Sequence, residues 1–197
     1  MKRAALLIID MQNDFVGEEA ILQVADAKRI IPKIQKALEL FRSRNLPVIH
    51  VLRVHKKDGS DVEIFRRHIF KETPFAVEGT RGAAVIDGLT PKSGEYELKK
   101  TRMSAFVGTP LDLILRSQMV DIVVVAGIQT PNCIRTTVFD AMAYNYHTCL
   151  VDDATGAQND EIHQSNVRDM RNIGVVILQA EDLPSFLDES GEILDTY

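Results

Sequence analysis

The sequence contains no tryptophan, only two cysteines and no apolar run long enough to cross a membrane. The apolar run from Ala4 to Ile9 stops at Asp10, well short of the roughly 20 apolar residues of a membrane-spanning helix and of the apolar part of a signal peptide. We therefore expect this run to be a strand, and we expect no contact between the protein and a membrane.

Basic residues are not in excess either. The 23 lysine and arginine residues are outnumbered by 28 aspartate and glutamate residues, which gives a net charge of −5 and a pI near 5.5. Aromatic residues are not interleaved with the basic ones. Because nucleic-acid binding depends on clustered positive charge, we expect no nucleic-acid partner.

The two cysteines lie in different contexts, Cys133 where a loop meets a helix and Cys149 inside an apparent strand. We predict no structural disulfide between them, and a cytoplasmic location, since the cytoplasm keeps thiols reduced.

The length of 197 residues, with 45% hydrophobic and 26% charged residues, predicts a single globular domain over residues 1–197.

Short buried strands alternate with helical segments along the chain. Apolar runs predict strands at residues 4–9, 46–53, 96–99, 121–127, 147–153 and 174–179, and helical spacing predicts helices near residues 26–41, 109–115, 133–145 and 159–172. This alternation predicts an α/β fold, doubly wound around a parallel sheet in three layers. Residues 54–95 lack sustained periodicity, which indicates an insert that supplies a lid or a binding loop.

Three reactive side chains follow three of these strands. Asp10 lies in DMQNDF, Cys133 lies in GIQTPNC, and a lysine begins KTRMSAF. The carboxyl ends of parallel strands meet at one edge of the sheet, where the active sites of open α/β folds lie. A carboxylate, an amine and a thiol at one place are the groups that a cysteine nucleophile requires.

Each of these residues also allows a purely structural interpretation. A helix start lowers the pKa of a thiol, with Asn132 as the cap of that helix, but Cys133 could simply fill a tight turn. Asp10 is placed to act as general base and acid, or to cap a loop. In YELKK the alternation of side chains puts Lys99 and Lys100 on opposite sides of the strand, and spacing alone does not choose between them.

The segments DMQNDF, KTRMSAF, GIQTPNCIRTTVFDAMAYNY and VDDA resemble the isochorismatase-like cysteine hydrolases, the nicotinamidase-related amidohydrolases, from Ala4 to about Leu178. The resemblance implies a six-stranded sheet in the order 3-2-1-4-5-6. It implies Asp10, Lys100 and Cys133 as the catalytic residues. It further implies a cis peptide bond between Ile128 and Gln129, which aims the amides of Gln129 and Cys133 at the oxyanion.

The resemblance also implies a reaction. The thiolate of Cys133 attacks the carbonyl of a small amide or carbamoyl compound, ammonia or an amine leaves, and water hydrolyses the thioester. No cofactor is expected, and family members commonly form homodimers or homotetramers. Nicotinamide, N-carbamoylsarcosine and ureidoacrylate all remain open as substrates.

The second predicted strand ends differently from that of the family's nicotinamidases, which hold a metal through an aspartate two positions before a histidine. This chain has Arg53, Val54 and His55 there, so we expect no metal site. Arg53 could bind a carboxylate of the substrate, or pair with Asp58 or Asp61. Phe15 is expected to form a wall of the pocket.

Three other functions compete with the amide hydrolase. Isochorismatases proper cleave a vinyl ether, and some replace the nucleophilic cysteine by a small residue, so Cys133 favours C–N hydrolysis. A thiol redox or binding module would not require Asp10 and Lys100. A dinucleotide-binding or flavodoxin-like protein would carry a glycine-rich loop after the first strand, where this chain has DMQNDF.

Overall fold

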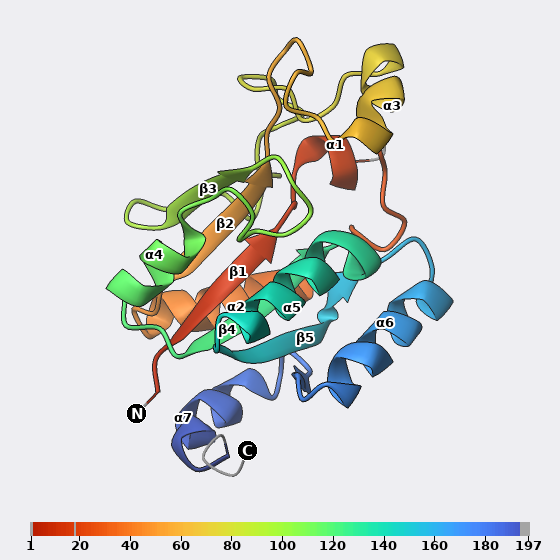
Figure 1. Ribbon diagram of the computed structural model, residues 1–197. Coiled ribbons are helices and arrows are strands. Elements are labelled where there is room, and N and C mark those ends of the chain that lie inside the picture. The colour runs from red at the N-terminus through yellow and green to blue at the C-terminus, as the bar shows by residue number, and fades with distance from the viewer. Residues whose placement is uncertain (1, 18, 194–197) are drawn as a thin grey trace.

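Six parallel strands form one sheet in the computed structural model, which describes residues 2–17 and 19–193 (Figure 1). The strands are β1 (Ala4–Ile9), β2 (Val48–Arg53), β3 (Tyr96–Lys100), β4 (Ile122–Ile128), β5 (His147–Gly156) and β6 (Val176–Leu178). Their order across the sheet is β3-β2-β1-β4-β5-β6, and every pairing is parallel. The predicted fold class and strand order are confirmed.

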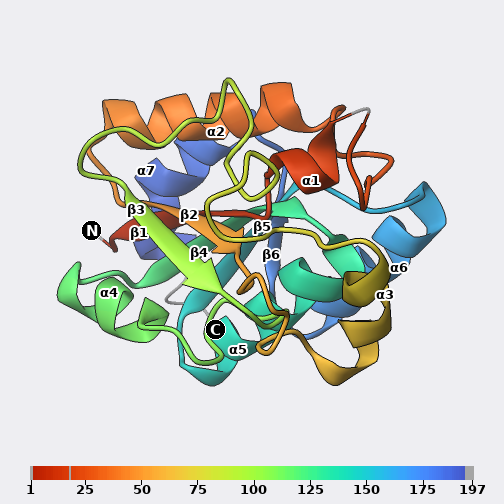
Figure 2. The same ribbon diagram turned by 90° about the horizontal axis from the view of Figure 1, so that it is seen from above.

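Helices cover both faces of this sheet. The view from above shows α2 (Ile31–Ser43) and α7 (Leu183–Ile193) on one face (Figure 2). The opposite face carries α4 (Leu111–Ser117), α5 (Arg135–Ala143) and α6 (Asp160–Asn172). These are the three layers that the alternating sequence pattern predicted.

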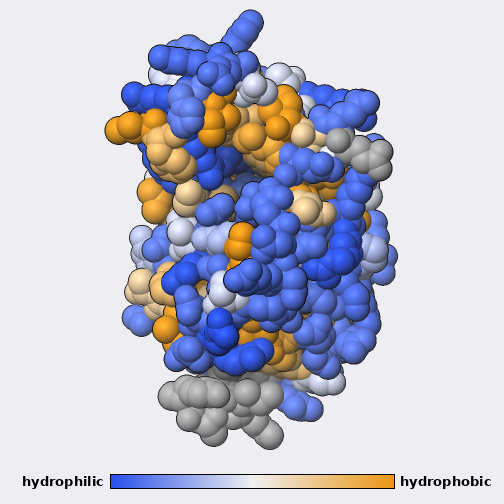
Figure 3. Space-filling model, turned by 90° about the vertical axis from the view of Figure 1, so that its right-hand side faces the viewer, coloured by the Kyte–Doolittle hydropathy of each residue, from blue (hydrophilic) through white to orange (hydrophobic). Residues whose placement is uncertain are grey.

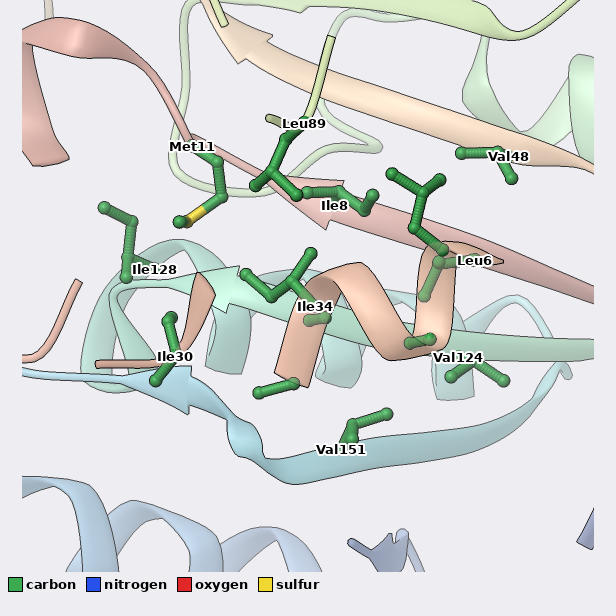
Figure 4. Packing of buried hydrophobic residues seen from close by; sticks show 14 of the residues in the cluster. Leu6, Ile8, Met11, Ile30, Ile34, Val48, Leu89, Val124, Ile128 and Val151 are labelled. Carbon is green, nitrogen blue, oxygen red and sulfur yellow. The ribbon is translucent and has the colours of Figure 1, made fainter. Parts of the chain in front are cut away.

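The side chains of β1 explain why both faces are covered. Successive residues of a strand point to opposite faces, and all six residues of β1 are buried. Leu6 and Ile8 pack with Ile34 of α2 (Figure 4), whereas Leu7 and Ile9 pack on the other side with residues of α4 and α5. Burial of each such side chain stabilises the fold by roughly 1.5–3 kcal/mol, which favours a central position for β1.

One prediction at the level of elements was wrong. The segment Thr130–Ile134 is a π-helical turn that precedes α5, so Asn132 does not cap a regular helix at Cys133.

The structure also contains a helix for which the sequence analysis gave no prediction, α7, near the acidic end of the chain. Leu183, Phe186 and Leu187 are buried there at helical spacing, and this apolar stripe holds the helix on the sheet despite its acidic neighbours.

The insert of residues 54–95 lies beyond the carboxyl ends of β1 and β2, together with α1 (Asn13–Val16) (Figure 1). It contains a 3-10 turn (Ile64–Arg66) and α3 (Arg67–Glu72). Ile64 and Phe65 are 82% and 56% exposed. Figure 3 shows apolar surface in the upper part of the molecule, where α3 lies in Figure 1.

The side chains of Gln12, Asn13 and Asp14 tie this insert to the sheet. The amide nitrogen of Gln12 donates to the carbonyl oxygens of Arg53 and Ala83 at 2.8 and 2.7 Å, and its oxygen accepts from the Arg53 amide at 2.8 Å. Asn13 donates to two further carbonyls of the insert, and Asp14 accepts from the amide of Ala76.

Within the described residues, no helix is both long and apolar enough to span a membrane.

Candidate active site

A cavity of about 400 Å³ opens at the carboxyl edge of the sheet, a size that suits a small-molecule ligand. The residues that line it come from the ends of β1, β2 and β4, the segment after β5, α1, the insert, the loop before α2 and the turn Thr130–Ile134. They are Asp10, Phe15, Ile21, Leu22, Gln23, Val24, Arg53, Arg66, Ile69, Phe75, Ile128, Gln129, Asn132, Cys133 and Gln158. All the predicted site residues except Lys100 therefore line one cavity, and Lys100 contacts one of them directly.

Lys100 and Asp10 form a buried ion pair under the floor of the cavity. Lys100 Nζ lies 2.9 Å from Asp10 Oδ2 and donates a second hydrogen bond to the carbonyl of Arg102. Lys99 points the other way, to an ion pair with Glu78 on the surface, so the two lysines lie on opposite sides of β3 as the alternation predicted, and Lys100 is the one that reaches Asp10. Asp10 Oδ1 is buried without a hydrogen-bond partner among the described residues, and this oxygen is available to take a proton.

Cys133 lies in the π-helical turn Thr130–Ile134, is 5% exposed and lines the cavity. Burial and the negative charge of Asp10 raise the pKa of its thiol, whereas the positive charges of Lys100 and Arg53 lower it, and the net direction is upward. The sequence predicted a lowered pKa from a helix start, and this prediction was wrong because the thiol is desolvated beside a carboxylate.

The turn that carries Cys133 is fixed by neighbouring groups. The peptide bond between Ile128 and Gln129 is cis, as the resemblance implied. Behind the turn, Thr130 Oγ1 lies 2.8 Å from His163 Nδ1, and His163 Nε2 lies 2.9 Å from Asp152 Oδ1. The sequence analysis made no use of His163, although its partner Asp152 belongs to the VDDA segment that carried the resemblance.

Comparison with known proteins identifies the family of this chain. Residues 4–182 match the isochorismatase domain family. This protein belongs to the isochorismatase family. It is 47% identical over 178 residues to a probable inactive nicotinamidase of Arabidopsis thaliana, covering 88% of this chain and 91% of the plant protein. It is 31% identical to the maleamate amidohydrolase of Pseudomonas putida, covering 86% of this chain and 79% of that enzyme.

A solved structure shows the same fold in another isochorismatase family protein, from Desulfovibrio vulgaris. The two chains superpose with a TM-score of 0.93 at 43% sequence identity, over 95% of this chain and 100% of the other. The strand order and layers described above are therefore those of an isochorismatase family member.

Arg53 lies at the end of β2 and joins the insert to the cavity. Its Nη1 donates to both carboxylate oxygens of Glu63, at 2.8 and 3.0 Å, and its Nη2 lies 3.6 Å from Cys133 Sγ. Neither Asp58 nor Asp61, the partners that the sequence suggested, pairs with it. Glu63 comes from the aperiodic insert, and no local pattern in the sequence pointed to this long-range pair.

The same arginine argues against a metal of the nicotinamidase type. Arg53 stands two positions before His55 in the sequence, and its guanidinium lies against Glu63 and Cys133. Burial and the charge of Arg53 lower the pKa of His55, whose ring packs edge-on against Phe70 and Phe75. In the part of the chain that the structure describes, no three His, Cys, Asp or Glu side chains are grouped as metal ligands, so the residues present do not fit such an ion.

The charges around Cys133 lead to a prediction that needs no substrate. Replacement of Asp10 by Asn is expected to lower the pKa of Cys133, because the carboxylate charge that raises it is removed while Lys100 and Arg53 remain. Alkylation of Cys133 by iodoacetamide, followed by mass spectrometry from pH 6 to pH 10, should then become faster at every pH below the thiol pKa of the wild type. Cys149, which is fully buried in β5, serves as an internal control. Slower or unchanged alkylation in the variant would contradict the electrostatic account.

Proposed function

We propose that this protein is a cysteine-dependent amidohydrolase that cleaves the C–N bond of a small amide or carbamoyl compound through a thioester. The observation that carries the proposal is the placement of Cys133, Asp10 and Arg53 in one cavity, with Asp10 paired to the buried Lys100. A thiol, a base with a free oxygen and two cations are the groups that nucleophilic acyl transfer requires.

The first half of the proposed reaction forms the thioester. Asp10 takes the thiol proton of Cys133, and the thiolate attacks the carbonyl carbon of the substrate. The resulting oxyanion is stabilised by the backbone amides of Gln129 and Cys133, the role that the resemblance implied, and by the nearby positive charge. Asp10 then gives its proton to the nitrogen, the C–N bond breaks, and ammonia or an amine leaves.

The second half returns the protein to its starting state. Asp10 takes a proton from water, the oxygen attacks the thioester carbon, and the C–S bond breaks as the acid product forms. The departing thiolate regains the proton from Asp10. Lys100 and Arg53 lower the pKa of Cys133, and their charges stabilise the thiolate whenever it is present.

The names of the relatives bear on the substrate class. One relative is a maleamate amidohydrolase, which supports hydrolysis of an amide. The other is a probable inactive nicotinamidase, which gives nicotinamide no preference over other amides as the substrate.

Ammonia release from a panel of small amides tests the proposal. The panel contains nicotinamide, maleamate, N-carbamoylsarcosine and ureidoacrylate, each incubated with wild-type protein and with Cys133→Ala. We expect turnover of at least one compound that is lost in Cys133→Ala and retained in Cys149→Ala, because only the first thiol lines the cavity. Turnover that survives in Cys133→Ala would overturn the nucleophile and favour an ether-cleaving reaction, and no turnover by the wild type would reject hydrolysis of these compounds.

A further inference from the structure

The cavity contains one more positive charge than the reaction uses. Asp10 pairs with Lys100, and Arg53 pairs with Glu63. Arg66 also lines the cavity, so the described charged groups of the site and their direct partners comprise three cations and two anions. The excess of a single positive charge at a ligand-sized cavity suits a ligand with a single negative charge.

Arg66 is the cation left without a strong partner among the described residues. Its Nη1 lies 3.9 Å from Glu63 Oε1, beyond hydrogen-bonding distance. Both oxygens of Glu63 are instead within 3.0 Å of Arg53 Nη1. The guanidinium of Arg66 also lies over the ring of Phe65, 5.1 Å from its centroid, and no hydrogen bond joins it to a described residue.

The position of Arg66 fits a role in ligand binding. Its side chain is 19% exposed, so it is largely desolvated yet open to the cavity. A guanidinium in such a place binds a carboxylate through two parallel hydrogen bonds. Arg53 is less suited to that task, because Glu63 already occupies one side of its guanidinium and Cys133 lies beside the other.

The rest of the cavity wall is largely apolar. It includes Phe15, Leu22, Val24, Ile69 and Phe75, and the polar residues beside them are neutral amides, Gln23, Gln129, Asn132 and Gln158, so no further charged side chain lines it among the described residues. A ligand that fits these walls has a short apolar middle, with the reacting carbonyl at Cys133 and an anionic group at Arg66.

We propose that Arg66 binds a carboxylate of the substrate, so that the preferred substrates are small amides that carry one carboxylate away from the reacting carbonyl. This inference rests on the proposed amidohydrolase function for its statement about turnover. Its statement about binding stands on the cavity alone, and the two can be tested separately.

The first test compares amides that differ only in the carboxylate. Succinamate, glutaramate and adipamate are compared with butanamide, pentanamide and hexanamide as substrates of the wild type, Arg66→Met and Arg67→Met. Arg67 is the matched control, since it is exposed, bonds to the carbonyl of Val62 and does not line the cavity. We expect the wild type and Arg67→Met to prefer the anionic amides, and Arg66→Met to lose at least tenfold in kcat/KM on them, mainly through KM, with the neutral amides unchanged.

The second test measures binding without turnover. The Cys133→Ala protein is titrated calorimetrically with the same six amides, with and without the additional change Arg66→Met. Tighter binding of the anionic amides that falls at least tenfold in the double variant supports the inference, even if the wild type hydrolyses none of them and the proposed function fails. Equal binding of anionic and neutral amides, or an equal loss of both kinds in Arg66→Met, would overturn the inference while leaving the amidohydrolase proposal intact.

Discussion

Replacement of Lys100 by Met is expected to destabilise the protein by about 3–5 kcal/mol and to abolish turnover. Lys100 and Asp10 are both buried, with 2.9 Å between Nζ and Oδ2. Loss of one partner leaves the other as an uncompensated charge in the interior, which costs more than the pair contributes when intact. Urea-induced unfolding followed by circular dichroism measures the stability, and ammonia release measures the activity.

Lys99→Met is the matched control for this change. Lys99 is the neighbouring residue of β3, and its ion pair with Glu78 is on the surface, with both side chains about 60% exposed. Its replacement is expected to change the free energy of unfolding by no more than about 0.5 kcal/mol. The double variant Asp10→Asn/Lys100→Met should regain part of the lost stability, because no unpaired charge remains. A Lys100→Met protein as stable as Lys99→Met would show that the ion pair is not buried as described.

Replacement of Gly127 by Ala is expected to destabilise the protein by more than about 4 kcal/mol or to prevent folding. Gly127 has φ +113°, a backbone conformation that residues with a side chain rarely adopt. A Cβ placed there would lie 2.2 Å from the carbonyl oxygen of Ile9 and 2.7 Å from the backbone nitrogen of Ile9. These are backbone atoms of the adjacent strand, directly before Asp10. The clash can only be relieved by separating β1 from β4 at the active site. Thermal unfolding followed by calorimetry measures the effect.

Gly79→Ala separates the clash from the backbone strain. Gly79 has φ +78°, but no atom lies within 4 Å of the position that an alanine Cβ would take, so its replacement introduces strain alone, about 1–2 kcal/mol. If Gly127→Ala costs no more than Gly79→Ala, the close approach of β4 to the end of β1 is wrong.

The sequence allowed prediction of the features that depend on local pattern. Continuous apolar runs located β1 and β4, and the placement of Asp10 and Cys133 at one edge followed from parallel strands. Side-chain alternation placed Lys99 and Lys100 on opposite sides, and the family resemblance chose Lys100. Apolar runs and side-chain alternation arise between near neighbours in the chain, so these patterns are visible in the sequence.

The features that were missed depend on distant contacts. Glu63 and Arg66 come from a segment without periodicity, and their relation to Arg53 and the cavity arises only when the insert folds over the sheet. The raised pKa of Cys133 likewise depends on burial beneath that insert and on the charge of Asp10, 123 positions earlier in the numbering of the chain. Helix capping, a local rule, could not anticipate either effect.

The attachment of the insert through Gln12 and Asn13 has a consequence for how such proteins diversify. On the insert, both side chains bond to backbone carbonyls and not to side chains, and every amino acid offers a carbonyl. These bonds therefore tolerate exchange of the insert residues that supply the carbonyls, except at Gly82, where a Cβ would collide with the carboxylate of Asp14. Phe75 is buried in the core and Glu63 pairs with Arg53, so side chains of this kind must be kept. A chimaera that keeps DMQNDF, this glycine and those contacts can carry exchanged residues at the exposed positions of the insert while Asp10 stays in place.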